Sequence, residues 1–465
     1  MDTRSIALTL AVLAAASACT GERLPSGAEE GTGTVRIALA LPGGTRAGET
    51  VAATAAEKTV NRIDLFAYDH ATGLLVQSRS ATPSDVPDIM GVEMTVPKRF
   101  LDFYAVANGP ADLHDGTLTR DGLLGKTSLF TGNSPSSFVM RGSALSVDAA
   151  SATEIPVTLE RIACKVVLKR MTKAFSSPST QLKDVTLTDV RLVNVRKEVV
   201  LFDTSDPAPS ASDASYINPR SFAETGTGMT GAAGLSYSVA AEGTDLGDGI
   251  ALYFYPNAAA EADSAEGDDY VTKLVMTVDI DGTPYRYPVG LPQSAGTSGR
   301  NLVYQVENVT LNLLGNDESE SPNAYLTKKA ALLSLTVLGW DGTEVATSYA
   351  DPRSVFTVGG VGTFAADSGT MEVTITSRER DLVGRTTPLA WTADISADGG
   401  RTFTDTFPAW LGLSPSSGSG TAEGGETVTL SWDKSLMGTV GCADVVVRFT
   451  QASTGRMVVR YMKES

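Results

Sequence analysis

The chain has 465 residues, with 37 Lys and Arg against 54 Asp and Glu and a formal net charge of −17. This acidic balance argues against nucleic acid as a partner, because binding to a phosphate backbone needs a basic surface. The length allows three domains of ordinary size. An aromatic fraction of 7%, 45 glycines and recurrent Thr, Val, Ser and Ala predict an all-β chain with many turns.

Residues 1–18 are typical of an export signal. Arg4 supplies the positive charge, an apolar core follows, and the stretch is short for a membrane-spanning helix. Ala16–Cys19 (ASAC) resembles the lipobox of bacterial lipoproteins, in which Cys19 is lipidated and becomes the new N-terminus. The alternative is an ordinary signal peptide followed by an incidental Cys. Residues 19–32 then form a polar, Gly-rich tether.

A well-patterned strand follows this tether. Alternate residues fall on one face of it and are all apolar: Val35, Ile37, Leu39 and Leu41. The Pro-Gly-Gly sequence at 42–44 ends the strand, because Pro lacks a backbone donor and the glycines take up turn geometry. A loop of small and polar residues follows, within reach of a protease.

This arrangement predicts a temporary strand. Cleavage between Arg46 and Ala47, within a loop at 43–58, would free the strand at 34–42, and a strand of another subunit would fill the groove that it leaves. The alternative is a permanent first strand in which Arg46 is an ordinary loop residue.

Two further blocks of strand patterns follow, and they predict β domains at 33–159 and 160–344. Asp281-Gly282 between two alternating segments predicts a hairpin, and the change of phase between Val306 and Val309 predicts a β-bulge. Short strands with Gly and Ser turns then predict an immunoglobulin-like sandwich at 345–465. The strand segments that carry these predictions are Thr59–Asp69, Phe100–Asn108, Ser143–Leu159, Ile162–Met171, Leu182–Val195, Ala331–Trp340, Met371–Thr376 and Thr427–Trp432.

The sequence offers little for catalysis, for a cofactor or for a metal, and we predict none of the three. Cys164 and Cys442 lie in different predicted domains, which disfavours a disulfide, and no Cys/His cluster has metal-ligand spacing. His70 and His114 each stand beside an Asp, but no GxSxG nucleophile motif accompanies them, so surface histidines are the favoured interpretation. The chain is therefore not predicted to be an enzyme.

Three other features have an ordinary and a functional interpretation. Asp279–Gly282 and Glu266–Asp269 are acidic but lack the full spacing of a Ca²⁺ loop, so turns are favoured. Gly359–Gly362 does not fit a nucleotide-binding fingerprint. The aromatic residues of the last domain fit core packing, with a sugar-stacking platform as the alternative: Trp391, Phe403, Phe407, Trp410 and Trp432.

Several segments, taken in order along the chain, resemble the fimbrillin family, the pilins of type V pili on Gram-negative anaerobes. They are the lipobox at Cys19, the strand before Arg46-Ala47, Asn61–Tyr68, Phe103–Asn108, Arg161–Leu168, Leu252–Asn257 and Arg300–Tyr304. Together they cover roughly 33–340, and their order makes the resemblance specific.

The resemblance implies two transthyretin-like β-sandwiches and a lipoprotein precursor, palmitate-bearing, that is carried to the outer membrane. It further implies removal of the first strand by an Arg-specific protease and polymerisation with other fimbrial subunits by donor-strand exchange. Stalk subunits of the family provide the donor strand from their C-terminus. Here the strand that ends at Trp340 is followed by a further domain, similar to BACON-type immunoglobulin-like modules through Thr387–Ala393 and Pro408–Gly420.

The added domain favours a tip or accessory subunit over a stalk subunit. We therefore expect a structural or adhesive subunit of a surface fimbrium, with a host or bacterial surface ligand as a candidate partner. The alternative function is a surface lipoprotein that binds glycans through the last domain and is not polymerised. The donor strand, the protease and the ligand are not fixed by the sequence.

Overall fold

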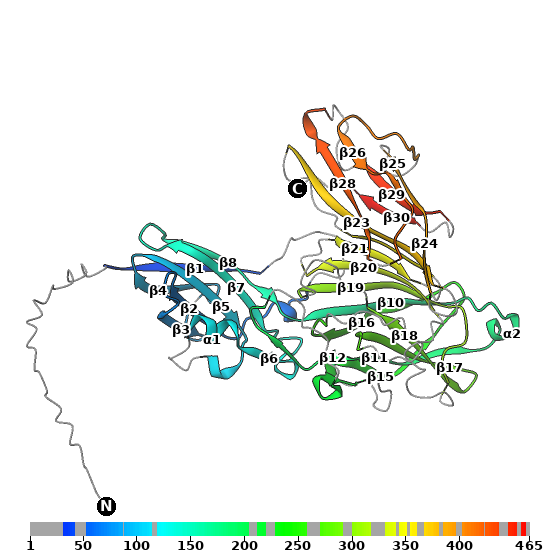
Figure 1. The fold of residues 1–465 in the computed structure, drawn as a ribbon. Helices are drawn as coiled ribbons and strands as arrows, with labels where there is room; N and C mark the ends of the chain where they lie inside the picture. The colour runs from blue at the N-terminus through cyan, green and yellow to red at the C-terminus, as the bar shows by residue number, and fades with distance from the viewer. Residues whose placement is uncertain are drawn as a thin grey trace, which may run out of the picture.

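The structure is a computed structural model. Its fold is nearly all β, as predicted. The structure describes residues 31–41, 53–86, 88–113, 119–203, 212–219, 228–257, 270–291, 300–317, 331–340, 344–350, 354–359, 367–380, 385–396, 402–422, 424–436, 445–452 and 457–461. These strands form three sandwiches in chain order, which we call the first, second and third sandwich (Figure 1).

The first sandwich contains the strand predicted to be removable, and it places this strand in the middle of the smaller sheet. That sheet has the order β4-β1-β8, with β4 (Gly91–Pro97), β1 (Thr32–Ala40) and β8 (Glu154–Thr158). The facing sheet has the order β3-β2-β5-β7-β9, with β3 (Leu75–Ala81), β2 (Ile63–Asp69), β5 (Phe100–Ala107), β7 (Met140–Asp148) and β9 (Glu160–Arg161). Apolar side chains of both sheets meet in one core.

The outer face of the larger sheet is also buried. Phe66, Tyr68 and Tyr104 point away from the first core and join a second apolar cluster, which extends into the second sandwich. The edge-to-face contact of Tyr104 with Phe202, at 5.2 Å between ring centroids, is one such link. The short elements of this region are η1 (Ala56–Lys58), η2 (Ala111–Leu113), α1 (Arg120–Leu124), β6 (Thr127–Leu129) and η3 (Phe130–Gly132).

The second sandwich packs two sheets around that shared core. One sheet begins with β16 (Thr244–Phe254), β10 (Cys164–Lys173), β19 (Leu302–Leu311) and β20 (Ala331–Gly339). The other has the order β15-β11-β17-β18, with β15 (Gly231–Ser238), β11 (Val185–Val193), β17 (Lys273–Ile280) and β18 (Thr283–Gly290). Its short elements are α2 (Pro178–Gln181), β12 (Val195–Arg196), β13 (Glu198–Val200), η4 (Asp213–Ser215), β14 (Tyr216–Ile217) and η5 (Gly228–Thr230).

The sheet that contains β20 continues without interruption into the third sandwich. Beyond β20 it runs through β21 (Glu344–Ala350), β22 (Ser354–Gly359), β23 (Ser368–Arg380), β28 (Glu426–Asp433) and β26 (Leu411–Ser414), with β24 (Thr386–Pro388) beside β23. The facing sheet holds β27 (Ser417–Gly418), β25 (Trp391–Ser396), β29 (Val446–Gln451) and β30 (Met457–Tyr461), and η7 spans Lys434–Leu436. β21 and β22 therefore connect two sandwiches that the sequence pattern alone separates near residue 345. Figure 1 shows β21 next to β20 at this junction.

Two local predictions are confirmed. Asp281 and Gly282 join β17 to β18 in a tight hairpin and have φ values of 51° and 82°, the left-handed region that such a turn requires. The ladder between β19 and β20 shifts register between Val306 and Asn308, where a bulge was expected. No helix within the described ranges is long and apolar enough to cross a membrane.

Candidate functional site

The candidate site is the groove that holds β1, bordered by β4 and β8. β1 runs antiparallel to β4, from the pair Thr32↔Pro97 to the pair Ala38↔Gly91. It runs parallel to β8, from Arg36↔Glu154 to Ala40↔Thr158. Both edges of β1 are therefore hydrogen-bonded, and its departure would leave unpaired backbone groups on two neighbouring strands.

The inward face of β1 is the predicted one. Val35 and Ile37 are each 1% exposed and Leu39 is 7% exposed. Leu41, just beyond the end of the strand, is partly buried and packs against the same core. Alternation with period two thus identified the buried face correctly, because successive side chains of a strand point to opposite sides of the sheet.

On the outward face, Arg36 joins the two neighbours of β1. One guanidinium nitrogen, Nη2, lies 2.8 Å from Asp88 Oδ2, and the other, Nη1, lies 2.8 Å from Glu154 Oε2. The hydrogen bond to Glu154, followed in size by the one to Asp88, raises the pKa of Arg36. Gly91 leaves room for this arrangement, since a Cβ at that position would lie 2.1 Å from Arg36 Nη2. We call Asp88, Gly91 and Glu154 the arginine cradle.

Nothing near β1 in the sequence marks the arginine cradle. Asp88 and Glu154 lie 52 and 118 residues from Arg36, and only the fold brings them together. Three other predicted site residues, Cys19, Arg46 and Ala47, lie outside the described residues, so lipidation and cleavage stay predictions.

The segment after the predicted cleavage loop is fixed by a buried ion pair. Glu57 is 1% exposed, and its Oε1 lies 2.8 Å from Lys165 Nζ and accepts a hydrogen bond of 2.7 Å from the Tyr253 hydroxyl. Its Oε2 accepts a bond of 2.7 Å from Thr54 N–H, while Glu57 N–H donates to Thr54 Oγ1, the reciprocal pairing of a capping box. Arg161 donates to the Glu57 carbonyl oxygen at 2.8 Å.

The charge state of this cluster follows from those contacts. Burial opposes ionisation of Glu57, but the hydrogen bond and charge of Lys165 and the bond from Tyr253 outweigh it, so the pKa of Glu57 lies below its ordinary value. Burial lowers the pKa of Arg161 to about 10, which leaves it charged at neutral pH. Arg161 also lies 4.5 Å from the ring centroid of Trp340, the residue after β20. We call these residues, Glu57, Arg161, Lys165, Tyr253 and Trp340, the junction cluster.

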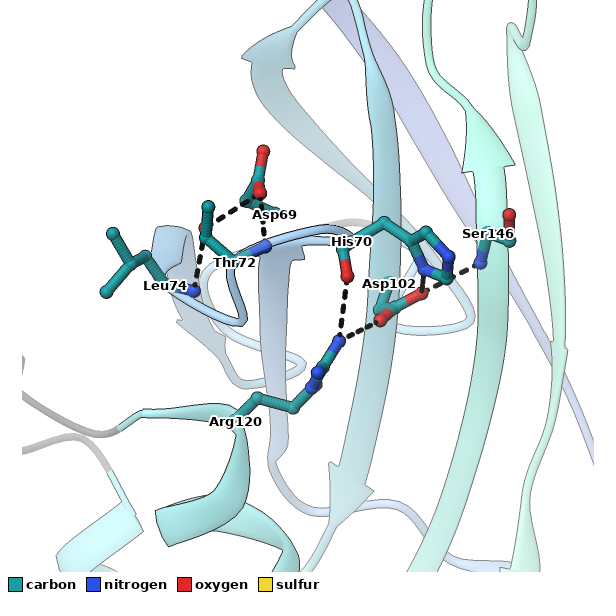
Figure 2. Close-up of polar contacts among 7 residues, drawn as sticks. All are labelled: Asp69, His70, Thr72, Leu74, Asp102, Arg120 and Ser146. Atoms are coloured by element: carbon teal, nitrogen blue, oxygen red, sulfur yellow. Dashed lines mark hydrogen bonds and ion pairs between the residues drawn. The ribbon is translucent and has the colours of Figure 1, made fainter.

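A second polar network surrounds the predicted surface histidine (Figure 2). His70 Nδ1 lies 2.8 Å from Asp102 Oδ1, Arg120 Nη1 donates to Asp102 Oδ2 at 2.7 Å, and Ser146 N–H donates to Oδ1 at 2.8 Å. Burial disfavours the charged carboxyl, yet these bonds, led by that of Ser146, hold the pKa of Asp102 below its ordinary value. The neighbouring Asp69 instead accepts bonds from Thr72.

This network joins the β2–β3 turn, β5, α1 and β7, so its contacts hold these four parts of the first sandwich together. Ser146 contributes its backbone N–H from a bulge with φ of 53°, and Figure 2 shows that this N–H, and not the Ser146 hydroxyl, contacts Asp102. The sequence places His70 beside Asp69, whereas its hydrogen-bond partner, Asp102, comes from a strand 32 residues away. His114 lies outside the described residues.

Trp391, Trp410 and the Asp279–Gly282 turn take their ordinary interpretation, while Phe403, Phe407 and Trp432 are partly exposed. Trp391 and Trp410 are 0% and 4% exposed, so both belong to the core of the third sandwich and neither offers a face to a sugar. Asp279 accepts a hydrogen bond from Gly282 N–H inside the hairpin turn. Cys164 is buried, and Cys442 is not among the described residues. Over the described part of the chain, no group of His, Cys, Asp and Glu could hold a metal ion.

Comparison with known proteins gave no matching family model and no matching curated protein. Similar solved structures do exist. A candidate cell adhesion protein from Parabacteroides distasonis is 14% identical with a TM-score of 0.47, covering 66% of this chain and 96% of its own. The fimbrilin FimA from Porphyromonas gingivalis is 12% identical with a TM-score of 0.43, covering 67% and 98%.

The tip fimbrial protein Mfa3 from Porphyromonas gingivalis, with a C-terminal truncation, is 12% identical with a TM-score of 0.38 and covers 66% of this chain and 100% of its own. These three structures are of fimbrial and cell adhesion proteins, and a further similar structure is of a candidate polysaccharide binding protein from Bacteroides thetaiotaomicron.

Proposed function

We propose that this protein is a structural or adhesive subunit of a surface fimbrium of type V, in a tip or accessory position. In this proposal it is exported as a lipoprotein through Cys19 and carried to the outer membrane. An Arg-specific protease cleaves between Arg46 and Ala47 and β1 leaves its groove. A strand of another subunit then takes its place.

The observation that carries the proposal is the setting of β1. It lies between two strands, fills the core with Val35, Ile37 and Leu39, and is joined to the following chain through the predicted cleavage loop. Burial of three such side chains contributes ~5–9 kcal/mol at 1.5–3 kcal/mol each. This is similar to the total stability of a domain, about 5–15 kcal/mol. An emptied groove would therefore strongly favour capture of a replacement strand, as in strand addition generally.

The setting of β20 supports the tip or accessory position. β20 ends beside Trp340 and is hydrogen-bonded on both sides, to β19 and to β21. Because β21 belongs to the segment that leads into the third sandwich, β20 is not free to leave as a donor without opening a continuous sheet. The protein would then accept a strand from a neighbour but not extend the fibre through β20.

The proposal is tested by Arg46→Ala in cells that assemble the fimbriae, with N-terminal sequencing of the mature chain and immunogold labelling of purified fibres. We expect the wild-type chain in fibres to begin at Ala47 and to label fibre ends. Arg46→Ala should remain as an uncut precursor outside the fibres. Thr45→Ala keeps the arginine and should be cut and assembled normally. Normal assembly of Arg46→Ala would refute the role of this bond, and label along whole shafts would refute the tip position.

A further inference from the structure

We propose that the β1 groove selects its replacement strand by charge: it accepts a strand that carries Arg or Lys at the register position of Arg36. This inference rests on the proposed strand exchange and names the chemistry of the partner. The expected partner is a strand of another subunit with the pattern apolar–basic–apolar–any–apolar, in the direction of Val35-Arg36-Ile37-Ala38-Leu39.

The first argument is that the apolar positions of the groove discriminate little between one candidate strand and another. Val35, Ile37 and Leu39 are buried because alternate residues of a strand face the core. Many β-strands of a fimbrial system would present alternating apolar residues in the same way. Backbone pairing to β4 and β8 is also independent of sequence. Specificity therefore needs a contact that some strands make and others do not.

The second argument is that the arginine cradle provides such a contact. Asp88, just before β4, and Glu154, in β8, lie on opposite sides of β1, and each is 2.8 Å from a different nitrogen of the Arg36 guanidinium. When β1 leaves, both carboxylates lose that cation. An incoming strand with an acidic residue at this position would add a third negative charge, and like charges brought together at an interface suppress wrong partners.

The third argument is that the groove is shaped for a long basic side chain. Gly91 stands opposite Ala38 in the ladder, and the Arg36 guanidinium passes over it. A Cβ at position 91 would lie 2.1 Å from Arg36 Nη2 and 2.6 Å from Cζ, so any other residue at 91 would require the guanidinium to shift from the position it has here. The glycine, the two carboxylates and the backbone ladder are thus consistent with one occupant chemistry.

The same argument bears on self-assembly. β20 reads ALLSLTVLG and contains no basic residue, so it does not match the arginine cradle. A copy of this chain would then be a poor donor to another copy through β20, whereas a different subunit with a basic residue in its donor strand would be a good one.

The test uses the full chain, cut at Arg46 and offered labelled peptides that correspond to residues 31–42. The peptides carry Arg, Lys, Gln or Glu at position 36, and incorporation is measured by native mass spectrometry and by fluorescence anisotropy. We expect the Arg and Lys peptides to bind roughly three- to tenfold more tightly than the Gln peptide, and the Glu peptide to be weaker again by roughly tenfold. Added salt should narrow these ratios, because the pairs are exposed.

Two further variants change the groove instead of the peptide, and each is judged by which peptide it prefers. Asp88→Lys with Glu154→Lys should reverse the order, so that the Glu peptide binds best. Gly91→Ala should reduce the preference for Arg over Gln, because the added Cβ requires the Arg guanidinium to shift.

Equal incorporation of the Arg and Glu peptides at low salt would overturn the inference and leave strand exchange standing. Failure of every peptide, the native one included, would overturn strand exchange itself and this inference with it.

Discussion

The two segments on either side of the predicted cleavage bond are held in place by different physical means. Upstream, β1 is held by backbone ladders, three apolar side chains and one exposed arginine. Downstream, Glu57 is held by a buried ion pair with Lys165 and by a hydrogen bond from Tyr253. The upstream contacts could be remade by another strand with the same apolar alternation and a basic residue at the position of Arg36, whereas the downstream contacts fit one residue at one position.

This difference in contacts determines which side of the bond can be exchanged. Cleavage at Arg46–Ala47 would leave Ala53–Thr59 attached to the second sandwich through the junction cluster and would make only β1 free to leave. Ala53 would stay beside Trp340, because its N–H donates to the Trp340 carbonyl oxygen.

Complete removal of β1 should have the largest effect. After cleavage and extraction of the strand in denaturant, the refolded chain should lose ~5–9 kcal/mol in free energy of unfolding, because three buried side chains are gone. Urea unfolding followed by fluorescence measures this change. A cut chain that keeps β1 in its groove is the control and should lose far less. If the trimmed chain were as stable as the uncut one, β1 would not contribute to the stability of the first sandwich as argued.

Glu57→Ala should be next in size. It leaves Lys165 buried without its partner, which costs about 3–5 kcal/mol in the free energy of unfolding. The double variant Glu57→Met with Lys165→Met removes both charges and should recover most of that loss. Equal stability of Glu57→Ala and the wild type in urea would show that the junction cluster does not hold the downstream segment.

A single substitution on β1 tests how much one of its buried side chains contributes to the free energy of unfolding. Ile37→Ala should cost about 2–5 kcal/mol, because it empties part of the core between the two sheets. Thr34→Ala lies on the exposed face of the same strand and should change stability by less than about 0.5 kcal/mol. Thermal or urea unfolding compares the two, and equal effects would contradict the assigned orientation of β1.

The smallest effect should appear with pH. The pKa of Glu57 is lowered from 4.5 in the folded state, so its ion pair stabilises the fold above pH 4.5, and this contribution is lost as pH falls through the lowered value. The stability difference between wild type and Glu57→Gln should thus be constant from pH 7 to about pH 5 and shrink below it. A difference that grows on acidification would contradict the assigned charge state.

Much of the strand content was predictable, because it depends on local periodicity. The buried face of β1, the Asp281-Gly282 hairpin and the bulge near Asn308 all follow from spacing within a few residues. Burial on both faces of β2 was harder to predict. Phe66 and Tyr68 face the second sandwich, and nothing local indicates that another domain covers that side.

The polar contacts were not predictable, because each joins residues far apart in the chain. The partners of Arg36 are 52 and 118 residues away, and Lys165 comes from the strand that opens the second sandwich. The passage of one sheet from β20 through β21 and β22 into β23 was missed for the same reason. Composition changes near residue 345, but composition does not show which strand edges pair.

The central claim, that β1 must leave its groove for assembly, is tested most directly by locking it there. Thr34 and Thr95 are exposed register partners on β1 and β4, and directly opposite residues of antiparallel strands lie within disulfide range. Thr34→Cys with Thr95→Cys should be cut at Arg46 yet fail to enter fibres when oxidised, and a reductant should restore assembly. The single variant Thr34→Cys should assemble in both conditions. Fibres formed at normal yield by the oxidised, locked protein would contradict the account.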